Sequence, residues 1–210
     1  MNKIINKEEN SKGLFKSLKK VVSGTTVSRF FGLIRDISTT NLLGASIFHD
    51  IFVICLKIPN LFRRFFAEGA FSQGLIPVVA DYKERYSHKE VRLLVDSVAG
   101  TFGLILFVVS FIGVILAPVL VTIVAPGFIM DDGRFNLASL MLRFTFPYLL
   151  FVSLTAFAGG ILNTYGKFSV PALTPVILNI MLIFSVIFLA PRLNNPGLAL
   201  AYAVLAAGIV

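Results

Sequence analysis

Three runs without a charged residue determine what this chain can fold into. They cover residues 97–130, 144–166 and 168–191, and each exceeds the roughly 20 residues that a helix needs to cross a bilayer. The 210-residue chain is 56% hydrophobic and has a mean hydropathy of +0.85, more apolar surface than a soluble domain of this size buries. Strands of a membrane barrel would alternate apolar and polar residues, which these runs do not. The sequence predicts an all-α, polytopic bundle of transmembrane helices.

We expect about six transmembrane spans that follow a basic N-terminal segment. Residues 1–20 carry six lysines but no apolar core of signal-peptide length, so we interpret them as a cytoplasmic tail and interfacial helix start. Residues 21–210 form the transmembrane part. Its last span lacks a cap or flanking charge, so we expect that span to be truncated and the chain to be part of a longer transporter. The expected spans are 21–43, 47–82 with a kink, 91–124 with a bend at Pro118, 135–163, 171–189 and 197–210.

Lysine and arginine placement predicts the orientation. With a cytoplasmic N-terminus, eleven of these residues fall on the inner side and only Arg134 and Arg192 on the outer side, as the positive-inside rule favours. The basic residues behind the net charge of +8 are therefore distributed by membrane side. For this reason we expect membrane lipids rather than nucleic acid as partners. Cys55 is the only cysteine, and His49 and His88 are isolated. We therefore predict no metal site and no cofactor.

Basic side chains inside the expected spans are the main indication of function. A charge at the bilayer centre costs roughly 2.5–3.5 kcal/mol, so these residues need a compensating role. Five of the six lie in the first two spans together with three carboxylates, which leaves an excess of +2. Guanidinium groups form bidentate bonds with phosphate oxygens, so a diphosphate in a hydrated cavity fits this excess. The basic residues are Arg29, Arg35, Lys57, Arg63, Arg64 and Arg143, and the carboxylates are Asp36, Asp50 and Glu68.

The first span carries a polar stripe. Thr25, Ser28, Gly32, Arg35 and Thr39 recur at steps of three and four and share one helix face. This stripe lines a cavity in our preferred interpretation. In the alternative, small residues and an Arg–Asp pair connect two packed helices.

The second span places Asp50, Lys57, Arg64 and Glu68 within about 40° of one another on an ideal helix. Pro59 removes one backbone hydrogen bond and predicts a kink. Asn60 either satisfies the freed backbone group or faces the cavity. Alternatively, Arg63 or Arg64 is an interfacial anchor that reaches the head groups.

Two of these segments resemble the MurJ/MviN family of lipid II flippases. They are S-R-F-F-G-L-I-R-D at 28–36 and K-I-P-N-L-F-R-R-F-F-A-E-G-A-F-S-Q-G-L-I-P at 57–77. Weaker similarity follows at A-P-G-F (125–128), F-P-Y (146–148) and G-G-I-L-N-T (159–164). The resemblance implies the N-terminal lobe of a two-lobe flippase in the bacterial inner membrane. It also implies alternating access for an undecaprenyl-diphosphate-linked peptidoglycan precursor.

The resemblance also assigns candidate roles to residues. It implies that Arg29, Arg35 and Arg63 bind the substrate with Ser28, and we add Asn60 from its place beside Pro59. The helical wheel favours Arg64 over Arg63, but the motif favours Arg63. The remaining charged residues are expected to be gating residues or charge partners: Asp36, Asp50, Lys57, Arg64 and Glu68. This interpretation requires Arg29, Arg35 and Arg63 to face a common pocket, and it requires a C-terminal lobe from the same or a second chain.

Other function classes fit less well. A flippase for another diphosphate-linked oligosaccharide, of the O-antigen type, has the same charge requirements and stays open. A cation exporter should have a net acidic site. An intramembrane enzyme should have a carboxylate cluster or an acid–base pair, and here the carboxylates are spread over two helices. We therefore predict no enzymatic activity. A non-transporting membrane subunit should pair its arginines fully and leave no cavity.

Overall fold

The computed structural model describes the backbone of residues 2–44, 46–68 and 70–210. It describes the side chains of residues 22–44, 46–66, 74–168 and 170–210. All regular structure within these residues is helical, so the predicted fold class is confirmed. The α-helices are α1 (Asn2–Leu43), α2 (Ile47–Arg63), α3 (Ala70–Arg85), α4 (His88–Ile115), α5 (Ala117–Val124), α6 (Asp132–Thr145), α7 (Tyr148–Thr164), α8 (Ser169–Phe184) and α9 (Pro196–Ile209).

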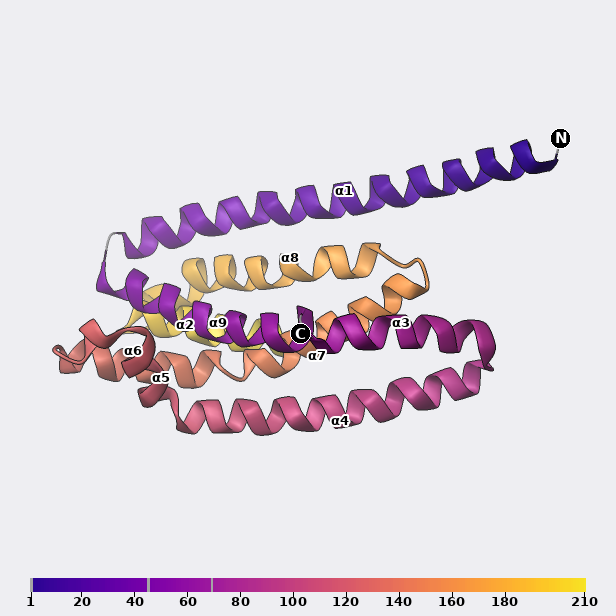
Figure 1. Cartoon of the computed structure of the whole chain (residues 1–210). Coiled ribbons are helices and arrows are strands. Elements are labelled where there is room, and N and C mark those ends of the chain that lie inside the picture. The colour runs from indigo at the N-terminus through magenta and orange to yellow at the C-terminus, as the bar shows by residue number, and fades with distance from the viewer. Residues whose placement is uncertain (1, 45, 69) are drawn as a thin grey trace.

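The long helices run side by side as an elongated bundle (Figure 1). α1 lies along one side and packs on α8, while α4 lies on the opposite side and packs on α7. Lys83, at the end of α3, donates to the Thr164 carbonyl at the end of α7 over 2.9 Å, and its ammonium lies 4.4 Å from the centre of the Tyr165 ring. This contact places the α3–α4 and α7–α8 connections at the same end of the bundle, as the charge distribution predicts.

Three described helical segments are long and apolar enough to cross a membrane. They are His88–Ile115, Asp132–Thr164 and Val170–Arg192. Residues 22–43, the part of α1 whose side chains are described, are too charged to qualify, since every 18-residue stretch of them contains Arg29, Arg35 and Asp36. α2 has only 17 residues. α4 exposes large hydrophobic side chains along its length, including Leu104, Phe107 and Phe111, which a bilayer accommodates and water does not.

Prolines and π-helical turns interrupt the expected spans. α4 ends at Ile115 and α5 begins at Ala117, so the predicted bend at Pro118 is confirmed. The expected span 135–163 is divided into α6 and α7, because Pro147 cannot donate within a helix. α2 continues into a π-helical turn at Arg64–Glu68, and α8 into another at Ser185–Leu189. α1 begins at Asn2, so its helix is longer than the expected span 21–43.

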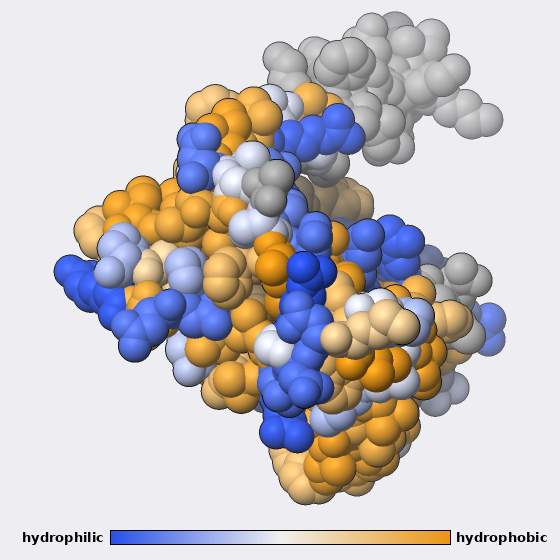
Figure 2. Space-filling view, turned by 90° about the vertical axis from the view of Figure 1, so that its left-hand side faces the viewer, coloured by the Kyte–Doolittle hydropathy of each residue, from blue (hydrophilic) through white to orange (hydrophobic). Residues whose placement is uncertain are grey.

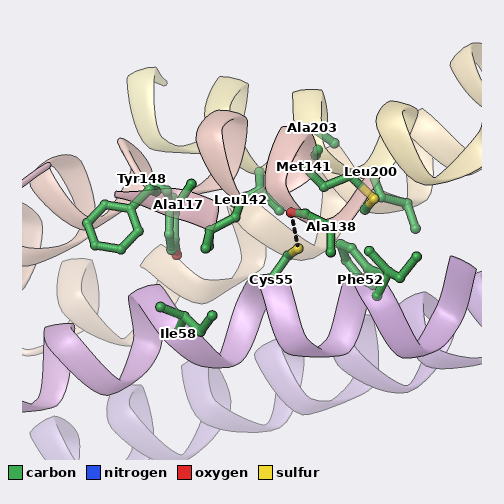
Figure 3. Packing of buried hydrophobic residues seen from close by; sticks show 14 of the residues in the cluster. Phe52, Cys55, Ile58, Ala117, Ala138, Met141, Leu142, Tyr148, Leu200 and Ala203 are labelled. Carbon is green, nitrogen blue, oxygen red and sulfur yellow. Dashed lines mark hydrogen bonds between the residues drawn. The ribbon is translucent and has the colours of Figure 1, made fainter. Parts of the chain in front are cut away.

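The core lies between α2, α6 and α9 (Figure 3). Ile51, Cys55, Met141 and Leu200 are fully buried there. The Cys55 thiol points across to α6, where it donates to the Ala138 carbonyl over 3.4 Å. The only cysteine of the chain is therefore part of the packing between α2 and α6.

A threonine of α6 compensates for the proline in α2. Pro59 has no N–H, so the carbonyl four residues earlier, on Cys55, lacks its helical donor. The Thr145 hydroxyl donates to this carbonyl over 3.1 Å, and its side chain is fully buried. Thr145 therefore takes the role that the sequence offered to Asn60, whose amide oxygen instead accepts from Arg63 Nε at 3.4 Å.

Replacing Thr145 by valine should destabilise the fold. The substitution keeps the shape of the side chain but leaves the Cys55 carbonyl without this donor, at a cost of about 1 kcal/mol. We expect a lower melting temperature in detergent. Thr101→Val is the matched control, because the exposed Thr101 hydroxyl bonds only the Ser97 carbonyl of its own helix. Equal melting temperatures for both variants would contradict a role for Thr145 across the α2–α6 contact.

Gly113 should tolerate no side chain. A Cβ atom there would overlap the ring of Phe146, whereas a Cβ at Gly100, in the same helix, would meet nothing within 4 Å. Gly113→Ala should therefore displace the buried Phe146 ring and cost about 1–3 kcal/mol. Gly100→Ala should be neutral or slightly stabilising, because alanine favours helix. Thermal unfolding of the two variants measures the difference, and a stable Gly113→Ala chain would refute the close contact.

Candidate functional site

The polar stripe of α1 packs against α8. A Cβ atom at Gly24 would lie 3.0 Å from the Cβ of Ala172, so the two helices approach closely there. Further along, the Asn179 amide donates to the Ser28 carbonyl over 3.2 Å, and its Nδ2 lies 3.7 Å from the position of a Cβ on Gly32. Much of the stripe thus forms the helix contact that was the alternative interpretation, although Thr25 is exposed.

Arg35 lies at the border of this contact. Its Nη1 donates to Asn179 Oδ1 over 3.0 Å, and its Nη2 and Nε donate to Asp36 Oδ1 over 2.6 and 3.0 Å. The Arg35 side chain is 29% exposed and that of Asp36 is 64% exposed. Arg35 is therefore held in one orientation by a neutral amide and a carboxylate, yet remains accessible to a ligand.

Arg63 lines a separate cavity of about 460 Å³. Residues of α3, α7 and α8 complete the wall, among them Ile76, Gly160 and Pro175. On α8, Pro175 precedes Asn179 by four residues, so both lie on one face about one helical turn apart. The cavity of Arg63 and the amide that holds Arg35 are therefore neighbours on α8, although Arg35 itself does not line this cavity.

Lys57, Asn60 and Arg64 line a different hollow of about 400 Å³, together with Val124 of α5. Lys57 and Arg64 are exposed. Arg63 and Arg64 thus lie on different sides of the helix, as consecutive helical residues must. Asn60 connects the two sides, because it lines this hollow while its amide oxygen accepts from Arg63.

The structure does not gather all predicted site residues: Arg29, Arg35 and Arg63 do not share either of the cavities described above, although the sequence interpretation required a common pocket. Arg29 is exposed and lies about 120° around α1 from Arg35, so it lines neither of these cavities. Asp50 is exposed in the first turn of α2, more than two turns from Arg64. Arg143 is exposed on α6. The Glu68 side chain lies outside the described residues.

The end of the molecule that carries the α1–α2 connection is partly hydrophilic. Figure 2 shows hydrophilic residues crossing this end between larger hydrophobic areas. The connection between α5 and α6 carries an ion pair of Arg134 with Asp131 at 2.9 Å. Neither of these two residues lines a cavity described above.

Sequence reasoning missed Asn179. It is 5% exposed, although it lies in the charge-free run 168–191. A buried amide in an apolar span is a signal in itself, since a side chain of this kind needs a hydrogen-bond partner inside the membrane. Its partners on α1 lie about 150 residues away in sequence, and only the fold identifies them.

Comparisons with known proteins agree with the resemblance. The sequence model of the family described as "Lipid II flippase MurJ" matches residues 39–210. The chain is 41% identical to the probable lipid II flippase MurJ of Vibrio cholerae over 207 residues, 95% of this chain and 39% of the relative. It is 42% identical to the lipid II flippase MurJ of Burkholderia cenocepacia over 197 residues, 94% of this chain and 38% of the relative.

A solved structure shares the fold. It is the lipid II flippase MurJ in an inward closed conformation, with a TM-score of 0.72 and 28% identity over 90% of this chain and 40% of that one. The chain thus spans about two fifths of the length of the proteins it matches. Because the family match covers most of the chain, this multi-pass membrane protein belongs to the family of the lipid II flippase MurJ.

Proposed function

We propose that the chain forms the N-terminal lobe of a flippase for a polyprenyl-diphosphate-linked peptidoglycan precursor of the lipid II type. The flippase moves the head group from the cytoplasmic to the outer leaflet of the bacterial inner membrane. The observation that carries the proposal is the arrangement of Arg63 and Arg35 along α8. Arg63 lines a cavity to which Pro175 of α8 contributes, and Arg35 is held, partly exposed, by Asn179, which lies one turn further along the same face of α8.

The chemistry of these two arginines suits a diphosphate. Guanidinium groups are always charged and bind phosphate oxygens through two parallel hydrogen bonds. Asp36 and Asn179 orient Arg35 before a ligand arrives, which lowers the entropic cost of binding. No bond is broken in such a cycle, and the site needs affinity for a dianion without an acid or base. We therefore propose a transporter without enzymatic activity.

A second lobe is part of this proposal. The relatives are more than twice as long as this chain, and alternating access requires two bodies that move against each other. The exposed charges Arg29, Asp36, Lys57 and Arg64 would be costly against lipid. We propose that they face the interior between the lobes, where the predicted binding and gating roles would apply. Asp50 and Glu68 keep their predicted gating roles on the same basis.

The non-transporting subunit has less support. In a subunit of that kind the arginines should be fully paired and leave no cavity, whereas Arg63 lines a cavity of about 460 Å³. A flippase for another diphosphate-linked oligosaccharide shares the phosphate chemistry. The similarity to lipid II flippases favours the peptidoglycan precursor.

Arg35→Ala should weaken the binding of a polyprenyl diphosphate by the chain in lipid nanodiscs. The substitution removes a charged guanidinium group and its hydrogen bonds to the phosphate, and this loss corresponds to about a tenfold or larger decrease in affinity. Asn179→Leu should cause a smaller loss, because Arg35 keeps its charge but loses one of its two orienting partners. Arg192→Ala is the control, since Arg192 bonds the Phe188 carbonyl of its own segment. Unchanged affinity in Arg35→Ala chains that insert normally would refute the proposal.

The chain expressed by itself should not restore growth to cells depleted of their own lipid II flippase. The physical reason is that a single lobe cannot close both faces of a pathway in turn. Colony counts after depletion, with membrane insertion verified by fractionation, measure the outcome. Restored growth would show that the chain transports without a different second lobe.

A further inference from the structure

Arg143 is an exposed cation in an apolar part of the chain. It belongs to the segment Asp132–Thr164, which is long and apolar enough to cross a membrane. Its side chain makes no hydrogen bond or ion pair with the described residues. Asp132, at the start of the same helix, is eleven residues away, about 16 Å along the helix axis. A cation in this position is costly against lipid unless an anion accompanies it.

The packing of α4 shows what lies beside this arginine. Phe102 of α4 contacts Phe157 of α7, with ring centres 5.9 Å apart. Eleven residues further along α4, a Cβ atom at Gly113 would overlap the ring of Phe146, which lies eleven residues before Phe157. α4 therefore runs antiparallel to α6 and α7 in a constant register. Three residues beyond this contact, the break between α4 and α5 lies at about the level of Arg143.

Arg143 lies on the face of α6 that is turned away from α2. Ala138 and Thr145 of α6 both bond to Cys55 of α2, and Arg143 lies about 140–160° around the helix from each of them. Phe146, which contacts α4, is about 60° from Arg143. The arginine is therefore on the outer surface of the lobe beside α4, and not on the side of α2, whose exposed charges we place between the lobes.

The exposed side chains around Arg143 are apolar. Leu140 lies about one turn away on α6, and Leu116 and Val119 lie opposite, at the break between α4 and α5. Side chains of a helix lean toward its N-terminal end, which is the end near Arg134 that the charge distribution assigns to the outer side. Arginines at such a depth reach the head groups by this leaning and by local thinning of the bilayer.

These surroundings fit an anionic lipid. The guanidinium binds phosphate oxygens through two parallel hydrogen bonds, and the exposed leucines and valine need contact with hydrocarbon. A free anion offers no hydrocarbon, and a zwitterionic head group brings a cation of its own. A second copy of the chain on the same face would bring a second Arg143 and, from the residues named above, no carboxylate.

We propose that Arg143 is a binding site for the phosphate of an anionic phospholipid from the outer leaflet, whose acyl chains lie against Leu116, Val119 and Leu140. The site is on the outer surface of the lobe and is separate from the cavity of Arg63. It goes beyond the proposed function, because it binds a lipid of the surrounding bilayer and takes no part in moving a polyprenyl diphosphate.

The test measures lipid binding to the whole chain in detergent by native mass spectrometry, with phosphatidylglycerol and phosphatidylcholine of identical acyl chains as probes. Arg143→Gln should weaken phosphatidylglycerol binding about tenfold or more, while affinity for phosphatidylcholine stays within about twofold. Arg134→Gln is the matched control, because it removes the same charge from the same helix but from a guanidinium that is paired with Asp131.

A conservative variant and a second measurement guard against an effect on folding. Arg143→Lys keeps the charge but loses the paired hydrogen bonds, so it should weaken phosphatidylglycerol binding less, by about threefold. Phosphatidylglycerol should also raise the melting temperature of the unchanged chain and of Arg134→Gln, because a ligand of the folded state stabilises it. It should not do so for Arg143→Gln.

The outcomes separate the possible occupants. Selective loss of phosphatidylglycerol in Arg143→Gln supports the site. Equal affinity of the unchanged chain for both lipids, or unchanged phosphatidylglycerol binding in Arg143→Gln, overturns it. Binding of inorganic phosphate as tight as that of phosphatidylglycerol would show that no lipid is required. A dimer that Arg143→Gln dissociates, with lipid binding unaltered, would assign the arginine to a contact between chains. None of these results bears on the diphosphate proposal, since neither lipid carries a diphosphate.

Discussion

The interior of a bilayer offers no hydrogen-bond partners, so every polar group in a spanning segment has to find a partner within the protein. Much of the described structure follows from this constraint. Pro59 leaves the Cys55 carbonyl without its helical donor, and Thr145 supplies a hydroxyl from α6. Asn179 lies in an apolar segment, and α1 offers it both a guanidinium and a carbonyl. In each case one polar residue forms a hydrogen bond across the contact between two packed helices.

The same constraint shapes the candidate site. Arg35 is compensated by Asp36 and Asn179 but stays partly exposed, so it is stable without a ligand and still available to one. α8 is the shared element, because it supplies Asn179 to Arg35 and Pro175 to the cavity that Arg63 lines. α8 therefore borders the surroundings of both arginines: it bonds Arg35 directly and forms part of the wall of the cavity that Arg63 lines.

Close helix packing brings these groups within reach of one another. Gly24 permits α1 to approach α8 at Ala172, and Gly160 lies where a Cβ atom would be 2.9 Å from Ile76 of α3. Small residues serve this purpose in membrane proteins because helices gain there by van der Waals contact and not by the exclusion of water. The polar stripe of α1 therefore packs against α8 in addition to carrying Arg35.

The sequence by itself determined the helical membrane class, the family, the bend at Pro118 and the concentration of arginines in the first two helices. Charge-free runs and short motifs are local signals, and a bilayer leaves few ways to satisfy them. Only the tertiary structure decided that Thr145, and not Asn60, serves Pro59, that Asn179 holds Arg35, and that Arg63 and Arg64 line different hollows. These outcomes depend on which helices lie next to each other. Residues about 90 and 150 positions apart leave no periodic pattern from which that contact could be inferred.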